Sequence, residues 1–169
     1  INFGPDKNLG GYINSVTGRD MLLWNGGCHV HGQFSLEKIL ELKAAHPSAK
    51  ILVHPECPAP IQKVADVIGS TAGLLKYSIE NEATEFIVAT ESGILHEMQK
   101  ACPDKTFIPA PPETTETVGC SCNECSYMKL NTLSKLYNTL KHEWPTVEVD
   151  PAISQKALRP INRMLELSK

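Results

Sequence analysis

The sequence has no apolar run that approaches the roughly 20 residues of a membrane span. Its first residues lack the charged start, apolar core and small-residue cleavage site of a signal peptide. It also has no excess of positive charge, because 16 Lys and Arg against 19 Asp and Glu give a net charge of -3. Nucleic-acid binding needs a basic face. We therefore expect a soluble, cytoplasmic protein whose main partner is neither a membrane nor a nucleic acid.

Disulfides are not needed to stabilise a chain of this size. With 169 residues, the chain is long enough to bury a core without covalent cross-links. In the cytoplasm thiols stay reduced, so the six cysteines are expected to be metal ligands, catalytic groups or buried small side chains. The chain starts at Ile1 without a methionine, and we expect it to be part of a longer protein.

Apolar runs alternate with helical patterns through the first two thirds of the chain. The expected strands cover residues 21–24, 50–53, 85–89, 106–108 and 147–149. Helical patterns cover 36–46, 61–68, 71–79, 94–101, 130–144 and 152–167, the last interrupted at Pro160, while 1–18 is rich in turn residues. Such alternation predicts a parallel sheet with helices on both faces, that is, an α/β fold.

Chemically able residues follow several of the expected strands. Cys28 comes after the first strand, His54 and Glu56 after the second, and Thr90 and Glu91 after the third. Ligands of open parallel sheets bind beyond the carboxyl ends of the strands. The sequence therefore predicts a functional site at this edge of the sheet.

Three cysteines lie close together at Cys120, Cys122 and Cys125. Spacing alone leaves four interpretations open: a zinc site, for which the run lacks a fourth ligand nearby, an iron-sulfur site, a redox pair of Cys122 and Cys125, and a loop that merely happens to be rich in cysteine. The isolated Cys57 and Cys102 are expected to be inert small side chains.

Cys28 follows Gly26 and Gly27, two glycines that would let the backbone approach a bulky inorganic group. Its neighbours include His29 and His31. On spacing alone, Cys28 is as well explained by a turn as by a metal ligand.

Several ordered motifs resemble those of the quinolinate synthase family, and the resemblance spans nearly the whole chain. The motifs are Phe3-Gly4-Pro5-Asp6-Lys7-Asn8-Leu9-Gly10, Trp24-Asn25-Gly26-Gly27-Cys28-His29-Val30-His31, Val53-His54-Pro55-Glu56-Cys57, Gly69-Ser70-Thr71, Ala89-Thr90-Glu91-Ser92-Gly93 and Cys125-Ser126-Tyr127-Met128-Lys129 with Asn131. The resemblance implies a three-layer α/β/α sandwich with short parallel sheets, within a protein of three similar domains around a pseudo-threefold axis.

The resemblance also implies a function. Members of the family condense iminoaspartate with dihydroxyacetone phosphate to quinolinate, in de novo NAD biosynthesis, and carry a [4Fe-4S] cluster held by three cysteines. Two of these cysteines fall on Cys28 and Cys125 of this sequence. The substrate-binding triplet falls on His54, Pro55 and Glu56, and a further substrate contact falls on Thr71.

The family's first domain, with the first cluster cysteine, has no counterpart in this sequence. We expect residues 1–25 to end the preceding α/β domain, 26–112 to form a complete α/β/α domain, and 113–169 to supply the cysteine loop and helices that complete another domain. The chain alone is then expected to be inactive without its missing N-terminal portion. The alternative is a zinc-binding or thiol-redox interaction module built on the cysteine run.

The resemblance gives the residues at the strand ends specific roles. Glu56 is the expected general acid and base, and His54, two positions away, is expected to bind a substrate carboxylate or share the proton transfer. Ser70 and Thr71 begin an expected helix, where free N–H groups suit a phosphate or carboxylate. Simple N-capping explains Ser70 and Thr71 equally well.

Overall fold

The computed structural model describes residues 1–113 and 123–168. The chain divides into two compact units, Ile1–Ser126 (unit 1) and Tyr127–Lys169 (unit 2). Cys120 and Cys122, two members of the cysteine run, lie outside the described residues.

Unit 1 is built on a four-stranded parallel sheet with the order β4-β3-β5-β6. The two central strands, β3 (Lys50–Val53) and β5 (Glu85–Ala89), are flanked by β4 (Val67–Ile68) and β6 (Thr106–Pro109). The central strands are short runs of mostly apolar residues that are buried on both faces, which is the pattern of a parallel sheet covered on both sides. The predictions for β3, β5 and β6 are confirmed, and β6 extends one residue further.

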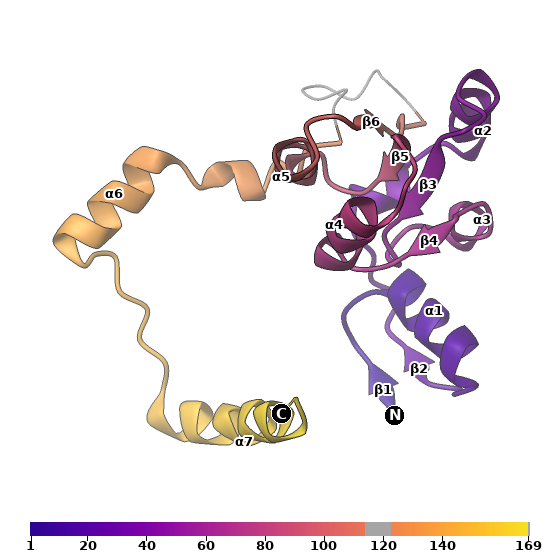
Figure 1. The fold of residues 1–169 in the computed structure, drawn as a ribbon. Helices are drawn as coiled ribbons and strands as arrows, with labels where there is room; N and C mark the ends of the chain where they lie inside the picture. The colour runs from indigo at the N-terminus through magenta and orange to yellow at the C-terminus, as the bar shows by residue number, and fades with distance from the viewer. Residues whose placement is uncertain (114–122, 169) are drawn as a thin grey trace. The chain divides into compact units, whose positions relative to one another are not determined.

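Helices cover both faces of this sheet. One core packs Ile51, Val53, Ile87 and Ala89 with side chains of α2 (Leu36–Ala45) and α3 (Ala59–Gln62). The opposite core packs Leu52, Phe86 and Val88 with α4 (Thr71–Glu80) and α5 (Gly93–Ala101). Figure 1 shows the two helix pairs on opposite sides of the strands. Alternate strand residues therefore serve opposite cores, and the predicted three-layer α/β/α sandwich is confirmed.

The N-terminal segment is not the series of turns that its glycines suggested. It forms β1 (Asn2–Phe3), helix α1 (Lys7–Thr17) and β2 (Leu22–Leu23), with β1 and β2 paired in parallel. Asp6 caps the start of α1, and Gly18, with φ of 67°, ends it. Gly10 lies inside the helix. A side chain is not tolerated at this position, because a Cβ there would lie 2.5 Å from Leu23 Cδ2. This glycine serves close packing of α1 against the two strands and does not break the helix.

The segment 61–68 was predicted to be one helix, and this is wrong for most of its length. Helix α3 ends at Gln62, and the segment ends in the two-residue strand β4. Strand β4 pairs with β3 through Leu52–Val67 and Val53–Ile68. A strand of two residues is too short to give a periodic sequence signal. Strand β4 is recognised only from its hydrogen-bonded pairing with β3.

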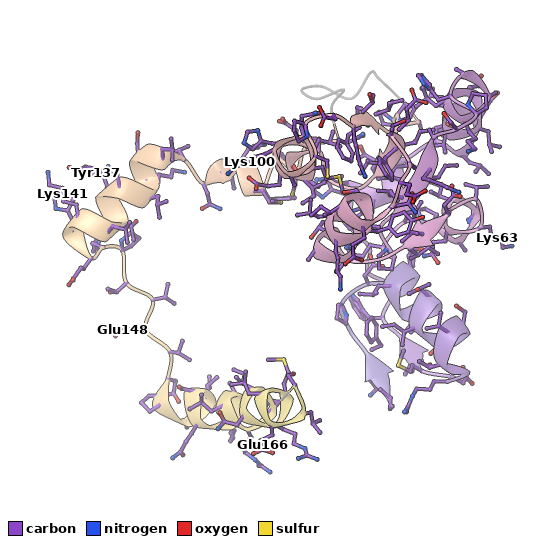
Figure 2. All side chains as sticks on the ribbon, in the orientation of Figure 1. Lys63, Lys100, Tyr137, Lys141, Glu148 and Glu166 are labelled. Carbon is purple, nitrogen blue, oxygen red and sulfur yellow. The ribbon has the colours of Figure 1, made fainter. Side chains whose placement is uncertain are left out.

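Unit 2 contains η2 (Met128–Leu130), α6 (Leu133–His142) and α7 (Pro151–Leu167). The predicted strand at 147–149 is wrong, because these residues have no strand partner in the described chain. Pro160 does not interrupt α7, which continues through it. In α6 the Lys141 ammonium lies 5.5 Å from the centre of the Tyr137 ring, one turn away (Figure 2).

Unit 2 buries none of its described residues. Both of its long helices are amphipathic, and their apolar side chains are exposed. Those of α6 are Leu133, Leu136, Tyr137 and Leu140, and those of α7 include Ile153, Ile161, Met164 and Leu165. Amphipathic helices gain most of their stability by packing this face against a partner. Among the described residues, no helix combines the length and apolar character needed to cross a membrane.

Candidate functional site

The site lies where β3 and β5 end, and it begins with a pair of histidines. His31 comes from the turn that follows Cys28, and His54 comes directly after β3. Their rings stack with centroids 4.3 Å apart and an angle of 13° between the planes. Burial lowers the pKa of both imidazoles. Both rings are therefore neutral near pH 7. Each ring then has one nitrogen that donates a hydrogen bond and one that accepts.

Thr90 holds His31 in place. Its side chain is 2% exposed, and its hydroxyl lies 3.0 Å from His31 Nε2. The other ring nitrogen, Nδ1, lies 3.0 Å from Glu56 Oε2. If Nδ1 carried a lone pair, that lone pair would be repelled by the carboxylate oxygen. The favourable tautomer therefore has its proton on Nδ1, and the Thr90 hydroxyl donates to Nε2.

His31 Nδ1 is nevertheless not satisfied. It is buried and makes no hydrogen bond with the described residues, although Glu56 Oε2 lies 3.0 Å away. Buried polar groups are normally hydrogen-bonded. A small shift of the Glu56 carboxylate would complete the bonding of His31 Nδ1.

Glu56 occupies the turn after His54. Its carboxylate is 25% exposed, and Oε2 lies 3.8 Å from His54 Nδ1. The backbone N–H of Glu56 donates to His54 Nδ1 at 3.3 Å. Because Nδ1 accepts this bond, neutral His54 carries its proton on Nε2. Asn8 of α1 fixes the turn by donating to the Glu56 carbonyl at 3.0 Å.

Cys28 lies beside this acid-base group. The Cys28 sulfur, a ring nitrogen of His31 and a carboxylate oxygen of Glu56 all lie within 4.8 Å of one another. The thiol is half-buried and free, and the Cys28 N–H donates to Asp6 Oδ2 at 2.8 Å. A soft donor thus lies next to a histidine and a carboxylate.

The two glycines before Cys28 differ in their surroundings. A Cβ on Gly26 would lie 2.7 Å from Trp24 Cδ1, whereas a Cβ on Gly27 would meet only Asp6 Oδ2, at 3.6 Å. Gly26 therefore makes room for the Trp24 indole. The space beside Gly27 is open among the described residues, and the close approach of an inorganic group there stays a prediction.

Cys125 reaches the same strand end through Glu91. Its backbone N–H donates to Glu91 Oε1 at 3.3 Å, while Glu91 Oε2 accepts from Gly93 N–H at 2.8 Å. The preceding residue, Thr90, contacts His31. Two consecutive residues at the end of β5 therefore connect to both cysteine-bearing segments, which are 97 residues apart in the sequence.

The remaining predicted residues have different surroundings. Pro55 is buried, and its carbonyl accepts from Gln62 at 2.8 Å. Ser70 caps α4 by accepting from Gly73 N–H at 3.2 Å, and Thr71 is the exposed first residue of that helix. Both follow β4, at the same edge of the parallel sheet as His54, but in the described part of the chain they form no hydrogen bond with the histidine pair.

The isolated cysteines, which are predicted to be inert, are both buried. Cys57 is fully buried, and burial raises the pKa of its thiol to about 12. Its sulfur lies 3.4 Å from the Ala89 carbonyl. Cys102 is also buried and contacts the Ser78 carbonyl at 3.8 Å. With this pKa, the Cys57 thiol stays protonated near neutral pH and is not available as a thiolate ligand.

Sequence reasoning did not assign Asp6, Asn8, Thr90 or Glu91 to any role. Asp6 could have been found as the N-cap of a helix, had the glycines of α1 not obscured that helix. The others act through contacts 34 to 59 residues away in sequence. No local pattern encodes such contacts.

Comparison with known proteins identifies relatives along the whole chain. Residues 1–166 match a family model described as Quinolinate synthetase A protein. The chain is 54% identical over 168 residues to "Quinolinate synthase" of Microcystis aeruginosa, covering 99% of this chain and 51% of the relative. It is 53% identical over 169 residues to "Quinolinate synthase" of Chloroherpeton thalassium, covering 100% of this chain and 52% of the relative. The chain spans about half the length of these curated relatives.

Proposed function

The chain belongs to the quinolinate synthase family, and from this premise we propose that it is the C-terminal part of a quinolinate synthase. The full-length enzyme would condense iminoaspartate with dihydroxyacetone phosphate to quinolinate in NAD biosynthesis. The observation that carries the proposal is the end of β5, where Thr90 contacts His31 and Glu91 holds Cys125. This arrangement joins a proton-transfer group to two free thiols.

We propose that Cys28 and Cys125 hold a [4Fe-4S] cluster, with a third cysteine supplied by the missing N-terminal portion. Both thiols are free and half-buried, as expected of ligands that must bind an inorganic group at a domain boundary. Cys57 and Cys102 are excluded by their burial. The donors present therefore fit two of the three thiolates that the family requires.

A mononuclear zinc ion is a poorer occupant of the group formed by Cys28, His31 and Glu56. Tetrahedral zinc with bonds near 2.0–2.3 Å needs ligand atoms about 3.3–3.8 Å apart. The separation of 3.0 Å between His31 Nδ1 and Glu56 Oε2 is shorter than this range. At least one of these two side chains would therefore have to move to bind zinc.

The cluster, when bound, would supply a Lewis-acidic iron that favours loss of water from a substrate hydroxyl. Glu56 is the proposed general acid and base, because its carboxylate is partly exposed and contacts both histidines. His54 would donate its Nε2 proton to a substrate carboxylate. His31, held by Thr90, would present its Nδ1 proton to Glu56 and orient that carboxylate.

Ser70 and Thr71 are proposed to bind a phosphate or carboxylate of the substrates. They begin α4, a helix of ten residues whose N-terminal N–H groups favour an anion. Ser70 Oγ accepts from Gly73 N–H, so its own O–H remains available as a donor. The exposed Thr71 hydroxyl adds a second donor.

The domain organisation is likewise a proposal. Residues 1–25 would end one α/β domain, 26–112 would form a second, and 113–169 would complete a third in a pseudo-threefold arrangement. The exposed apolar faces of α6 and α7 support this, because they need a packing partner. The missing N-terminal portion would supply that partner along with the third cysteine.

A complementation assay tests the proposal. Quinolinate formation is measured under anaerobic conditions for the 169-residue chain, for the N-terminal half of the parent protein, and for both together. We expect no turnover by the chain alone and turnover by the mixture or the full-length protein. Turnover by the chain alone would contradict the need for a third ligand. No quinolinate from the full-length protein would overturn the function.

Metal analysis separates the second class of function, a zinc-binding or thiol-redox module on the cysteine run. Iron with acid-labile sulfide in anaerobically purified full-length protein supports the enzyme. Stoichiometric zinc, or a metal-free protein with a reversible disulfide at Cys122 and Cys125, supports the module.

A further inference from the structure

Two carboxylates outside the acid-base group contact the two proposed cluster ligands in the same way. Asp6, 3% exposed, accepts a hydrogen bond from the backbone N–H of Cys28 at 2.8 Å. Glu91 accepts one from the backbone N–H of Cys125 at 3.3 Å. Each carboxylate binds the main chain of the cysteine and leaves its sulfur free. The two acids come from different elements, the start of α1 and the end of β5.

We propose that Asp6 and Glu91 are positioning residues that fix the Cys28 and Cys125 thiols for cluster binding. This inference rests on the proposed function. A cluster ligand must present its sulfur from a fixed backbone, and residues that orient metal ligands typically contribute 10- to 100-fold to metal affinity. A charged acceptor makes a stronger bond to an N–H group than a neutral one does.

The two oxygens of Asp6 have separate tasks. Oδ1 accepts from the N–H groups of Asn8 and Leu9, both at 2.8 Å, and so caps α1. Among the described residues, Oδ2 accepts from Cys28 alone. A helix cap needs one oxygen. The second oxygen therefore binds the main chain of Cys28, 22 residues away in sequence, to the start of the helix.

Further bonds restrict the same turn. Lys7 N–H donates to the Gly26 carbonyl at 2.9 Å, and Lys7 Nζ donates to Asn25 Oδ1 at 3.1 Å. The chain before Cys28 is thus bound to α1 at three points. Of the three, only the Asp6 bond reaches Cys28 itself, whose carbonyl also accepts from Gly32 N–H at 3.0 Å. Together these bonds fix the main chain from which the thiol projects.

Glu91 combines the same two tasks. Oε2 accepts from Gly93 N–H at 2.8 Å, at the first residue of α5, while Oε1 accepts from Cys125. Asn123 adds a bond beside it, because its carbonyl accepts from Ser92 N–H at 3.2 Å. The Cys125 segment is therefore attached to the start of α5, as the Cys28 segment is attached to the start of α1.

Substitution of Asp6 by Ser and by Ala separates the two tasks. Ser caps helices nearly as well as Asp, but its single oxygen cannot also reach Cys28. Both variants, made in the full-length protein, should release iron to a chelator about 10- to 100-fold faster than the unsubstituted protein. In the cluster-free protein, hydrogen exchange of the peptide that contains Cys28 should accelerate in both variants. Exchange within α1 should accelerate only in Asp6→Ala.

Two further variants complete the design. Asp150 caps α7 through Ala152 and Ile153 but contacts no cysteine among the described residues, so Asp150→Ser is the matched control and should leave iron release unchanged. Glu91→Ala should accelerate iron release and expose the Cys125 amide to exchange.

Unchanged iron release in both Asp6→Ser and Glu91→Ala, with an intact cluster, would overturn this inference alone. If iron release were faster in Asp6→Ala but unchanged in Asp6→Ser, Asp6 would act only as a helix cap. This result would overturn its positioning role. Absence of iron and sulfide from the unsubstituted full-length protein would overturn the proposed function, and this inference with it.

Discussion

The bond between Thr90 and His31 makes a specific prediction for the substitution Thr90→Val. Valine has the shape of threonine but lacks the hydroxyl that lies 3.0 Å from His31 Nε2. Both residues are buried, at 2% and 7% exposure, so the abandoned ring nitrogen cannot be solvated by water. His31 Nδ1 already lacks a hydrogen bond, and the variant would leave the imidazole with no hydrogen bond to the described residues.

The magnitude follows from the cost of a buried polar group without a partner, about 1–3 kcal/mol of unfolding free energy. For a protein of this size, each kcal/mol lowers the unfolding midpoint by about 2–4 °C. The ring is also free to turn away from Glu56. We expect activity of the full-length enzyme to fall about 10- to 100-fold, since small misplacement of a catalytic group has effects of this order.

The assays are thermal unfolding and quinolinate formation, with Thr90→Ser as the matched control. Serine keeps the hydroxyl and loses only a methyl group, so most of the activity should remain. The reasoning would be refuted if Thr90→Val retained full turnover, or if Thr90→Ser lost as much activity as Thr90→Val did.

Three further predictions concern the same site. Glu56→Gln in the full-length protein should keep the visible absorbance of the cluster and lose about 10²- to 10⁴-fold in turnover, as for loss of a general acid and base; normal turnover would remove Glu56 from the chemistry. Burial lowers the folded-state pKa of His31 and His54 below the ordinary 6.5, so the unfolded state binds protons first and stability should fall as the pH drops below about 6.5. Urea midpoints between pH 8 and 5.5 check this, and a double replacement by Asn that leaves the slope unchanged would contradict it. Cys57, with a thiol pKa of about 12, should resist alkylation in the folded cluster-free protein while Cys28 reacts; equal rates would be contrary to the structure.

The sequence was sufficient for the central sheet because burial on both faces produces short apolar runs. The sequences of β3 and β5 are such runs, and both strands form at the predicted positions. Strand β4 was missed because two residues carry no period, and it exists only through its pairing with β3. The Val-Glu-Val run at 147–149 shows the reverse error, since alternation without a partner strand does not make a sheet.

Helix α1 was missed for a different physical reason. Gly10 and Gly11 read as turn residues, but the missing Cβ of Gly10 allows the helix to pack against Leu23 and Phe3. A glycine required for close packing cannot be told from one required for a turn without its neighbours in space.

The candidate site was predicted in part. Residues that carry the chemistry follow the strands directly, so His54, Glu56 and Cys28 could be proposed from their positions and from the family resemblance. Residues that hold them could not, because Asp6, Thr90 and Glu91 act through bonds to distant segments. Hydrogen bonds of this kind are a property of the folded chain and have no local signature in the sequence.

The central claim is that Cys28 and Cys125 together hold an iron-sulfur cluster. The most direct test measures iron, acid-labile sulfide and visible absorbance of the full-length protein after anaerobic purification, in Cys28→Ala, Cys125→Ala and the control Cys102→Ala. Cys102 is buried against the Ser78 carbonyl, away from the strand ends that carry the site. We predict loss of the four-iron spectrum in the first two variants and its retention in the control. A four-iron spectrum retained in Cys28→Ala or Cys125→Ala would contradict the account.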